Sequence, residues 1–597
     1  MTMKLSDYVA QKVVELGIHQ VFMITGGGAM HLNQSLGNHP SLHCLFNHHE
    51  QASAMAAESY YRLTNRPAVV NVTSGPGGTN TITGVYGAWT DSLAVLVISG
   101  QVKYPTTVRS SGLPLRQLGD QEIDIQRLVE PITKYCVMVT DPQSIRYHLE
   151  KAYHLAVSGR PGPVWIDIPI DIQAARVELD RLIGFDPEEL TPTTASTALE
   201  VVADDILARV MTAKRPLLLA GSGIRLSGAH NEFLQLVERL GIPVVTAWNA
   251  HDTLWTDHPY YIGRPGTVGD RAGNFAVQSA DLLLVLGSRL NIRQISYNWE
   301  SFARKAYKIW VDIDPLELQK PTVQPDMPVV ADLKMLLPLL ADRHSGSPAD
   351  SHRSWLAWCQ ARKARYPVVS PEQCNGERIN PYCFMNTLFH ALPEDEIVVA
   401  ANGSACVVGF QAAYLKPGQR LWSNSGCAAM GYDLPAAIGA CLGNHGKRVI
   451  CLAGDGSIMM NLQELTTIVG ANLPIKIFLL NNGGYVSIRQ THTHFFGGRE
   501  IGTGPESGVS LPNFERLCAG FNLPYQRVNN YGDMVAAIKA TLQQQGPTLC
   551  EIVLDHTHVF EPKLASRQLA NGTMLSPSLE DMAPHLSNEE LMSNRIE

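Results

Sequence analysis

The sequence has few of the features that mark membrane, nucleic-acid-binding or secreted proteins. It contains no run of about eighteen uncharged apolar residues, so we expect no membrane span. Residues 1–10 show no apolar stretch behind a basic start, so we expect no signal peptide and a cytoplasmic location. Basic residues are outnumbered, at 47 Lys and Arg against 55 Asp and Glu, and the net charge of −8 argues against nucleic-acid binding.

Cysteine is also sparse and shows no pairing pattern. The eleven cysteines are scattered along the chain and include no Cys-x-x-Cys pair. This distribution favours reduced, mostly buried thiols over a disulfide framework or a zinc ribbon.

The length and the hydrophobic pattern indicate several α/β domains. A chain of 597 residues is too long for one hydrophobic core, and short apolar runs alternate with helical patterns, which is typical of parallel sheets flanked by helices. Polar, Pro-containing stretches at 180–195 and 342–351 read as linkers. We therefore predict domains at 1–180, 195–342 and 370–555, followed by a C-terminal arm at 556–597. The expected strands are 67–72, 93–99, 164–168, 216–220, 282–287, 308–313, 449–453 and 475–480.

The most informative segment lies in the last third. A buried strand ends in the turn Gly454-Asp455-Gly456 and leads into a helical pattern over 458–469, and the next buried strand ends in Asn481-Asn482-Gly483-Gly484. Successive parallel strands end at the same edge of a sheet, so Asp455 and Asn482 should lie close together.

These residue types suit a magnesium ion that carries a diphosphate. One carboxylate, one amide oxygen and backbone carbonyls are hard ligands that leave coordination positions for phosphate oxygens. The glycines allow close backbone approach, and a helix that begins near Ser457 would point its free amides at the same anion. Either turn alone also reads as an ordinary loop or hairpin, but the combination predicts a metal and diphosphate site.

The stretch from Gly454 to Asn482 resembles the signature of thiamine-diphosphate enzymes, and residues 425–439 resemble the segment that precedes it. The resemblance implies Mg²⁺ ligands at Asp455, Asn482 and the carbonyl of Gly484. It implies that Met430 bends the cofactor and that the carbonyl of Ala428 accepts from its amino group, although a methionine alone would read as core filling. The cofactor contacts implied by this likeness, including a second diphosphate turn at 402–404, are Gly403, Ser404, Ala428, Met430, Gly454, Gly456, Ser457 and Tyr485.

Enzymes of this family need an activating acid, which is a carboxyl group that can share a proton with the cofactor. A Glu in apolar surroundings can do this. Glu50 lies at the start of a small-residue helix after a short strand at 44–46, where a lone Glu would ordinarily be a surface residue favoured by the helix dipole. Its block resembles the family's His-Glu-Gln segment, and 73–80 resembles the family's Ser-Gly-Pro-Gly turn, which adds the cofactor contacts Ser74, Gly75 and Gly77. His48 and His49 are adjacent and cannot face one ion, so we expect packing or substrate-facing roles for them.

The segments 98–101, 120–124, 158–169, 220–225, 287–293 and 312–314 resemble the large catalytic subunit of the acetolactate synthase group, and this likeness covers nearly the whole chain. That likeness implies a substrate-facing Gln121, with Gln101 or the histidines of 492–494 as further polar groups near the substrate. It implies FAD in the middle third, where Gly-rich turns and arginines can bind a pyrophosphate. Related decarboxylases keep this fold without a flavin, so FAD stays an expectation. The residues expected to hold it are Gly221, Gly223, Arg225, Arg289, Arg293 and Asp312.

Three departures from that group concern the acceptor side of the reaction. Ile170, Asp120 and Thr491 stand where the group carries lysine, phenylalanine and tryptophan. We therefore expect an acetolactate-synthase-like carboligase that decarboxylates pyruvate or a related 2-oxo acid and transfers the acyl unit to an acceptor carbonyl, for instance that of a keto sugar. The alternatives are a flavin oxidoreductase of the pyruvate oxidase kind, a 2-oxo acid decarboxylase, and a hydrolase of diketone carbon–carbon bonds. The family likeness implies a homodimer or homotetramer with active sites between subunits.

Overall fold

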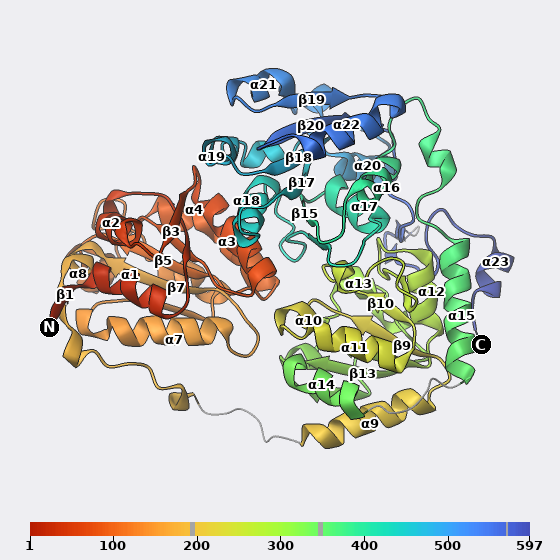
Figure 1. The fold of residues 1–597 in the computed structure, drawn as a ribbon, viewed down its shortest axis with the longest axis horizontal. Coiled ribbons are helices and arrows are strands. Elements are labelled where there is room, and N and C mark those ends of the chain that lie inside the picture. Colours follow the sequence, from red (N-terminus) through yellow and green to blue (C-terminus); the bar gives the residue numbers. More distant parts are fainter. Residues whose placement is uncertain (191–197, 344–349, 569–570, 597) are drawn as a thin grey trace.

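Three α/β domains make up the chain in the computed structural model (Figure 1), which describes residues 1–190, 198–343, 350–568 and 571–596. Each domain is built on a six-stranded sheet whose strands are all parallel, and helices flank the sheets. This confirms the predicted fold class. In Figure 1 the N-terminal domain lies on the left, the C-terminal domain at the top and the central domain at the lower right.

The N-terminal domain contains the sheet β3-β2-β4-β5-β7-β6. Its inner strands are wholly buried, as expected for Val- and Ile-rich runs covered on both faces. The strands are β2 (Gln20–Met23), β3 (His43–Phe46), β4 (Val69–Val72), β5 (Leu96–Gln101), β6 (Tyr135–Met138) and β7 (Val164–Pro169), and the main helices are α1 (Leu5–Glu15), α2 (Met30–Asn38), α3 (Glu50–Thr64), α4 (Pro76–Thr90), α7 (Ile145–Val157) and α8 (Ile170–Ala174).

The central domain contains the sheet β11-β10-β9-β12-β13-β14. Its strands are β9 (Pro216–Ala220), β10 (Val244–Thr246), β11 (Tyr261–Gly263), β12 (Leu282–Leu286), β13 (Tyr307–Asp312) and β14 (Met327–Val330), and its main helices are α9 (Leu199–Thr212), α10 (Gly223–Leu226), α11 (His230–Leu240), α12 (Arg271–Ser279), α13 (Ile292–Ile295) and α14 (Leu333–Arg343). Helix α15 (Asp350–Arg365) then runs from this domain toward the C-terminal one.

The C-terminal domain contains the sheet β16-β15-β17-β18-β20-β19. Its strands are β15 (Ile397–Ala400), β16 (Arg420–Trp422), β17 (Val449–Gly454), β18 (Ile475–Asn481), β19 (Tyr525–Val528) and β20 (Thr548–Val553), and its helices are α16 (Pro381–Ala391), α17 (Ser404–Ala412), α18 (Asp433–Gly443), α19 (Glu464–Gly470), α20 (Val486–Phe495), α21 (Phe514–Gly520) and α22 (Tyr531–Gln543), with α23 (Asn588–Ser593) in the tail. All eight strand runs predicted from the sequence are strands here and in the other two domains.

Helices α3 and α18 join the N- and C-terminal domains and lie side by side in Figure 1. Their close approach depends on small residues: a Cβ added at Gly439 would lie 2.0 Å from the carbonyl oxygen of Ala56. Apolar side chains of both domains belong to one buried cluster. The N- and C-terminal domains of one chain are therefore fixed against each other.

The expected absence of disulfides is wrong at one place, because Cys374 and Cys383 are bonded to each other across the start of α16; the remaining cysteines are free, and most of them are buried. Of the two predicted linkers, residues 191–195 and 344–349 lie outside the described residues. Among the residues that are described, no helix has both the length and the apolar character needed to cross a bilayer.

Candidate active site

Asp455 and Asn482 meet at the C-terminal edge of the last sheet, because β17 and β18 are neighbours and end side by side. Asp455 is 1% exposed, and its carboxylate accepts from the backbone amides of Gly456 (2.8 Å), Asn482 (3.1 Å) and Gly484 (2.9 Å). Burial raises the pKa of this carboxyl to about 6, and the backbone amides oppose that shift. The structure thus brings together the three residues predicted as metal ligands.

The side chain of Asn482 is the feature of this cluster that calls for a ligand. Its Nδ2 donates to Ser404 Oγ at 3.0 Å. Its Oδ1 is buried and has no hydrogen-bond partner among the described residues. A buried amide oxygen without a partner is costly, and a bound cation would satisfy it. One carboxylate, this oxygen and a backbone carbonyl make a hard donor set that fits Mg²⁺.

Glycines let the turn after β17 pack closely. A Cβ added at Gly456 would lie 2.3 Å from the ring of Tyr485, so only glycine fits there. The predicted helix over 458–469 is wrong in its first half, because a short 3-10 turn (Ile458–Met460) comes first and α19 begins only at Glu464. The chain leaves the helical conformation at Asn461, whose side chain donates to the carbonyl of Gly431 at 2.7 Å.

The turn at 402–404 holds a second loop against the first. Asn402 donates to Asn424 and to the carbonyl of Ala429, at 2.5 and 2.8 Å. Ala428 has a φ of 57° and is exposed, and Met430, two residues further on, is half-buried. Gly403, with a φ of 80°, starts α17. The loop that carries Ala428 also approaches the N-terminal domain, since a Cβ added at Gly426 would lie 2.3 Å from the carboxylate of Asp91.

Glu50 begins α3, as predicted, and is half-buried. Its carboxylate accepts from Asn80 of α4 at 3.1 Å. The helix cap is His49, whose ring accepts from the amide of Gln51, so this histidine has a structural role. Gln51 in turn accepts from Asn461 at 3.1 Å, which places the Glu50 end of α3 beside the C-terminal domain of the same chain.

Gln121 lies against the predicted cofactor turn of the N-terminal domain. A Cβ at Gly75 would meet the Gln121 carbonyl oxygen at 2.4 Å, and Gly75 itself has a φ of 60° at the start of α4, next to buried Ser74. Gln121 is exposed and has a φ of 61°. Its loop is held by Glu122, whose carboxylate accepts from the amides of 118 and 119; the sequence did not predict this role.

Gln101 does not face a substrate, which corrects that expectation. It is 1% exposed, donates to the carbonyl of Ile123 (2.9 Å) and to Asp167 (3.1 Å), and accepts from the amide of Val102 (3.0 Å). All of its hydrogen-bonding groups are therefore used inside the N-terminal domain. Of the histidines in α20, His494 contacts the carbonyl of Ser566 in the C-terminal tail at 3.0 Å.

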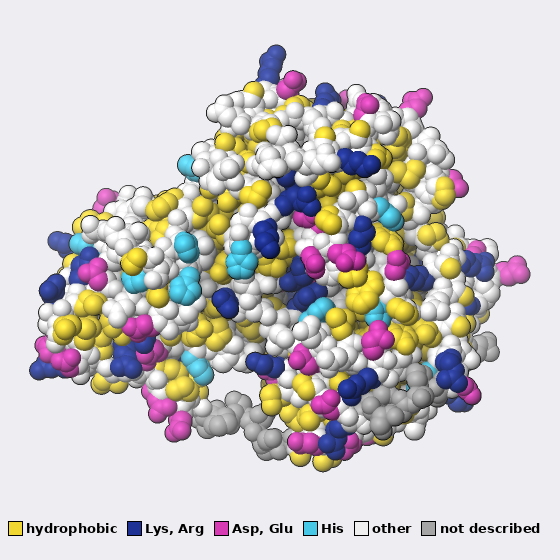
Figure 2. Space-filling model, in the orientation of Figure 1, with side chains coloured by type: hydrophobic (Ala, Val, Ile, Leu, Met, Phe, Trp, Pro, Cys, Tyr) yellow, Lys and Arg dark blue, Asp and Glu magenta, His cyan; other side chains and the backbone are white. Residues whose placement is uncertain are grey.

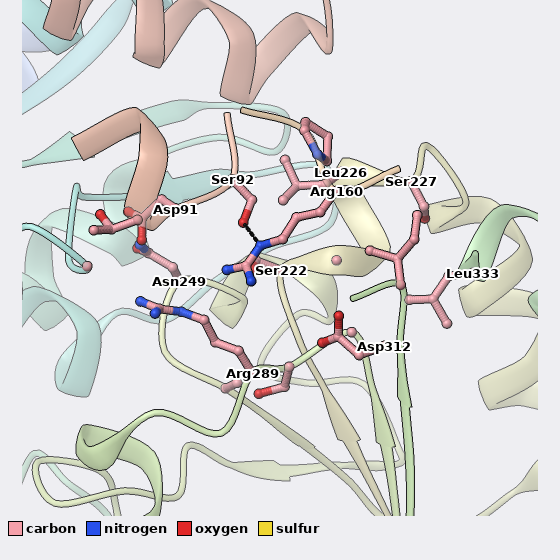
Figure 3. A pocket seen from close by; sticks show the side chains of 18 of the residues that line it. Asp91, Ser92, Arg160, Ser222, Leu226, Ser227, Asn249, Arg289, Asp312 and Leu333 are labelled. Carbon is pink, nitrogen blue, oxygen red and sulfur yellow. Dashed lines mark hydrogen bonds between the residues drawn. The ribbon is translucent and has the colours of Figure 1, made fainter. Parts of the chain in front are cut away.

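A cavity of about 380 Å³ lies where the three domains meet (Figure 3). Gly223 at the start of α10, Arg289 in the turn after β12 and Asp312 at the end of β13 line it, and all three were predicted to bind a flavin. Burial raises the pKa of Asp312 to about 6. Arginines on one side and a buried carboxylate on the other suit the phosphates and the ribose hydroxyls of a dinucleotide.

The N-terminal domain adds residues to this cavity that sequence reasoning missed. The guanidinium of Arg160 donates to Ser92 Oγ at 2.8 Å, as Figure 3 shows, and pairs with Asp314 and Glu317 at 2.9 and 2.7 Å. Asp91 also lines the cavity. The block 158–163 indicated the position of Arg160 in the sequence, but its place across a domain boundary could not be read there.

The other predicted flavin residues lie behind or beside the cavity. Arg225 forms an ion pair with Asp252 at 3.5 Å and does not line the cavity, so its predicted role as a phosphate partner has no geometric support. Gly221 allows the contact between two turns, since a Cβ there would lie 2.2 Å from the carbonyl of Gly287. The guanidinium of Arg293 stacks on Trp248, which does line the cavity, at 4.8 Å from the ring centroid.

Comparison with known proteins gives the family of this fold and site. Profiles for the N-terminal TPP binding domain, the central domain and the C-terminal TPP binding domain of thiamine pyrophosphate enzymes match residues 3–128, 203–340 and 401–552. The chain is therefore a thiamine pyrophosphate enzyme.

Full-length relatives narrow this class. The acetolactate synthase large subunit of Corynebacterium glutamicum is 34% identical over 89% of this chain and 83% of its own length. Isozyme 1 of the Escherichia coli large subunit is 30% identical over 92% and 94%, and the probable chloroplastic acetolactate synthase 2 of Oryza sativa is 32% identical over 94% and 84%. The chain belongs to the acetolactate synthase family.

Proposed function

We propose that this enzyme decarboxylates pyruvate or a related 2-oxo acid and joins the remaining acyl unit to a second carbonyl compound. The observation that carries the proposal is the buried Oδ1 of Asn482 beside Asp455, which has no hydrogen-bond partner in the part of the chain that the structure describes. It supports a Mg²⁺ ion held by Asp455, Asn482 and the Gly484 carbonyl, with the cofactor's diphosphate completing the coordination. Thiamine diphosphate supplies the electron sink for the departing carboxylate.

The chain's own residues would hold the cofactor and the substrate in position and exchange protons with them. Glu50 would share a proton with the cofactor's pyrimidine ring, and Met430 and the Ala428 carbonyl would hold that ring in its bent shape. Gln121, exposed beside the Gly75 turn, would donate to a substrate carbonyl. Ser74, Gly77, Ser404, Gly454, Gly456, Ser457 and Tyr485 would surround the cofactor.

The cavity between the domains would hold FAD. Its volume lies within the range of small-molecule sites, and the opposition of Arg160 and Arg289 to Asp312 supports a ligand with both phosphates and hydroxyls. Ser425 and Gly426 line it too, so the loop that carries Ala428 would separate the flavin from the thiamine ring.

The acceptor would be larger or more polar than a simple 2-oxo acid, such as a keto sugar. Thr491, where the family carries tryptophan, is exposed on α20, and Asp120 is exposed beside Gln121. Short polar side chains at these places leave room and hydrogen-bonding groups for a hydroxylated acceptor.

One incubation tests the proposal. Purified protein would be given pyruvate, Mg²⁺ and thiamine diphosphate, with and without a panel of ketones and keto sugars, and products would be identified by mass spectrometry. We expect carbon dioxide release and a ketone-dependent ligation product. Oxygen consumption, free aldehyde as the main product, or cleavage of a diketone would instead identify an oxidase, a decarboxylase or a hydrolase.

A further inference from the structure

A second large cavity, of about 1190 Å³, adjoins the Asp455 cluster and has no role in the proposal so far. Asn482 and Gly483 form one of its walls, and α20 forms another. The loop after β20 and the segment before α16 close it. It lies at the carboxyl ends of β18 and β20, the edge at which ligands of parallel sheets bind.

The cavity is basic although the chain is acidic. Its lining includes Arg378, Arg489, Arg527 and Lys563 against two carboxylates, those of Glu500 and Glu506. Arg489 is paired with Glu500 at 3.1 Å, and Arg527 lies 3.9 Å from Glu551. Arg378 and Lys563 form no ion pair with any described carboxylate.

Hydrogen bonds hold the side chains of Lys563 and Arg378 in place. Lys563 Nζ donates to Gln490 of α20 at 3.1 Å, and Arg378 donates to the ring of His556 at 2.6 Å. The Cys374–Cys383 disulfide encloses the short loop that carries Arg378. An anionic oxygen group would complete these donors, and phosphate is the anion that Arg and Lys commonly bind together.

His558 gives an independent sign of a ligand. It is 6% exposed, and its Nδ1 donates to the carbonyl of Asp555 at 2.6 Å. Its Nε2 is buried, with no hydrogen-bond partner among the described residues, and His558 is one of the residues that line the cavity. Burial lowers the pKa of His558, so the ring is neutral and Nε2 is an acceptor that calls for a hydroxyl donor.

We infer that this cavity binds a hydroxylated phosphate ester, such as a sugar phosphate, with the phosphate on Arg378 and Lys563 and a hydroxyl on His558. The inference builds on the proposed function, because such a ligand would serve as the acceptor or as an effector of the same reaction. The contact with Asn482 and Gly483 places it next to the cofactor's metal end.

The test uses holoenzyme saturated with thiamine diphosphate and Mg²⁺, so that the cofactor's own phosphate site is filled. Calorimetric titrations would compare fructose 6-phosphate, fructose and inorganic phosphate. We expect fructose 6-phosphate to bind at least about tenfold more tightly than either of the others, since each of them lacks one of the two groups recognised.

Matched variants locate the binding. Lys563→Gln and Arg378→Gln should each weaken fructose 6-phosphate binding about tenfold, and His558→Phe should reduce it to the level of inorganic phosphate. Lys539→Gln, on the exposed face of α22, is the control and should change nothing. Melting temperatures within the wild-type range show that each variant is folded, and Lys563→Met replaces Lys563→Gln if the latter falls outside that range.

The outcomes separate the two proposals. If fructose 6-phosphate is consumed together with pyruvate, it is an acceptor. If it alters carbon dioxide release without being consumed, it is an effector. Both results support sugar phosphate binding in the cavity. Binding only to apoenzyme, or binding unchanged in both cation variants, overturns it while pyruvate decarboxylation stands. If the wild-type enzyme does not decarboxylate pyruvate, the proposed function is overturned instead, whatever the titrations show.

Discussion

At the scale of single residues, Asn482 is the most sharply constrained member of the site. Its side-chain Nδ2 donates to Ser404 and its backbone amide donates to the Asp455 carboxylate. Its Oδ1, which has no partner among the described residues, is left for a ligand. No group of three His, Cys, Asp or Glu side chains that could hold a metal occurs among the described residues. A metal held by one carboxylate, an amide and a diphosphate would leave no such cluster, so the two findings agree.

Asn482→Ala should therefore weaken magnesium-dependent cofactor binding. Loss of one charge-assisted ligand contact corresponds to about a tenfold rise in the Mg²⁺ concentration needed for half-saturation. The measurement is quenching of tryptophan fluorescence by thiamine diphosphate during a Mg²⁺ titration. Asn231→Ala, on the exposed face of α11, is the control. An unchanged Mg²⁺ requirement in Asn482→Ala would remove this residue from the metal site.

Arg289 tests the flavin proposal in the same way. Its side chain points into the cavity of Figure 3 opposite Asp312. Arg289→Gln should therefore reduce the amount of flavin bound to the protein at least about tenfold, because a phosphate contact is lost. The absorption spectrum of the protein, recorded after dialysis against FAD, measures this without any assay of turnover. Arg209→Gln, in α9, is the control. A wild-type protein that takes up no flavin would show that the cavity has another ligand.

At the scale of elements, the packing of α3 on α18 sets the distance between the N- and C-terminal domains. The Cβ of an alanine at 439 would lie 2.0 Å from the Ala56 carbonyl, and backbone cannot move aside cheaply. Gly439→Ala should cost about 1–3 kcal/mol through overpacking, seen as a lower melting temperature. Gly470→Ala should leave the melting temperature unchanged, because a Cβ at this end of α19 meets nothing within 4 Å. Equal melting temperatures for the two variants would contradict this account.

The sequence predicted these elements unevenly, for physical reasons. Buried parallel strands read clearly because both of their faces are apolar, and the turns that follow β17 and β18 could be placed by strand order. The break at Asn461 could not, since it depends on a hydrogen bond to Gly431. Arg225 and Gln101 were misjudged because their partners, Asp252 and Asp167, are distant in the chain.

At the scale of the whole molecule, large apolar side chains close in the sequence to Glu50 and Asp455 are exposed. Phe46, four residues before Glu50, is 52% exposed, and Met460, five residues after Asp455, is 48% exposed. Figure 2 shows apolar side chains across the middle of the molecule, where the N- and C-terminal domains meet. An exposed apolar surface that borders polar site residues is typical of an interface. It supports a homodimer in which each site takes Glu50 from one subunit and Asp455 from the other.

Two inactive variants distinguish that arrangement from a site within one chain. Glu50→Gln should lower carboligation at least about 100-fold through loss of proton transfer while cofactor still binds, and Asp455→Ala should abolish Mg²⁺-dependent cofactor binding. Each is expected to be inactive alone. In a heterodimer formed by coexpression, shared sites would give one site that lacks both residues and one that has both. The mixed protein should therefore regain activity, with a KM for pyruvate like that of the wild type. Sites contained in single chains would leave every site with one defect, so a mixture as inactive as its parents, in a preparation shown by mass spectrometry to contain heterodimers, would refute the shared site.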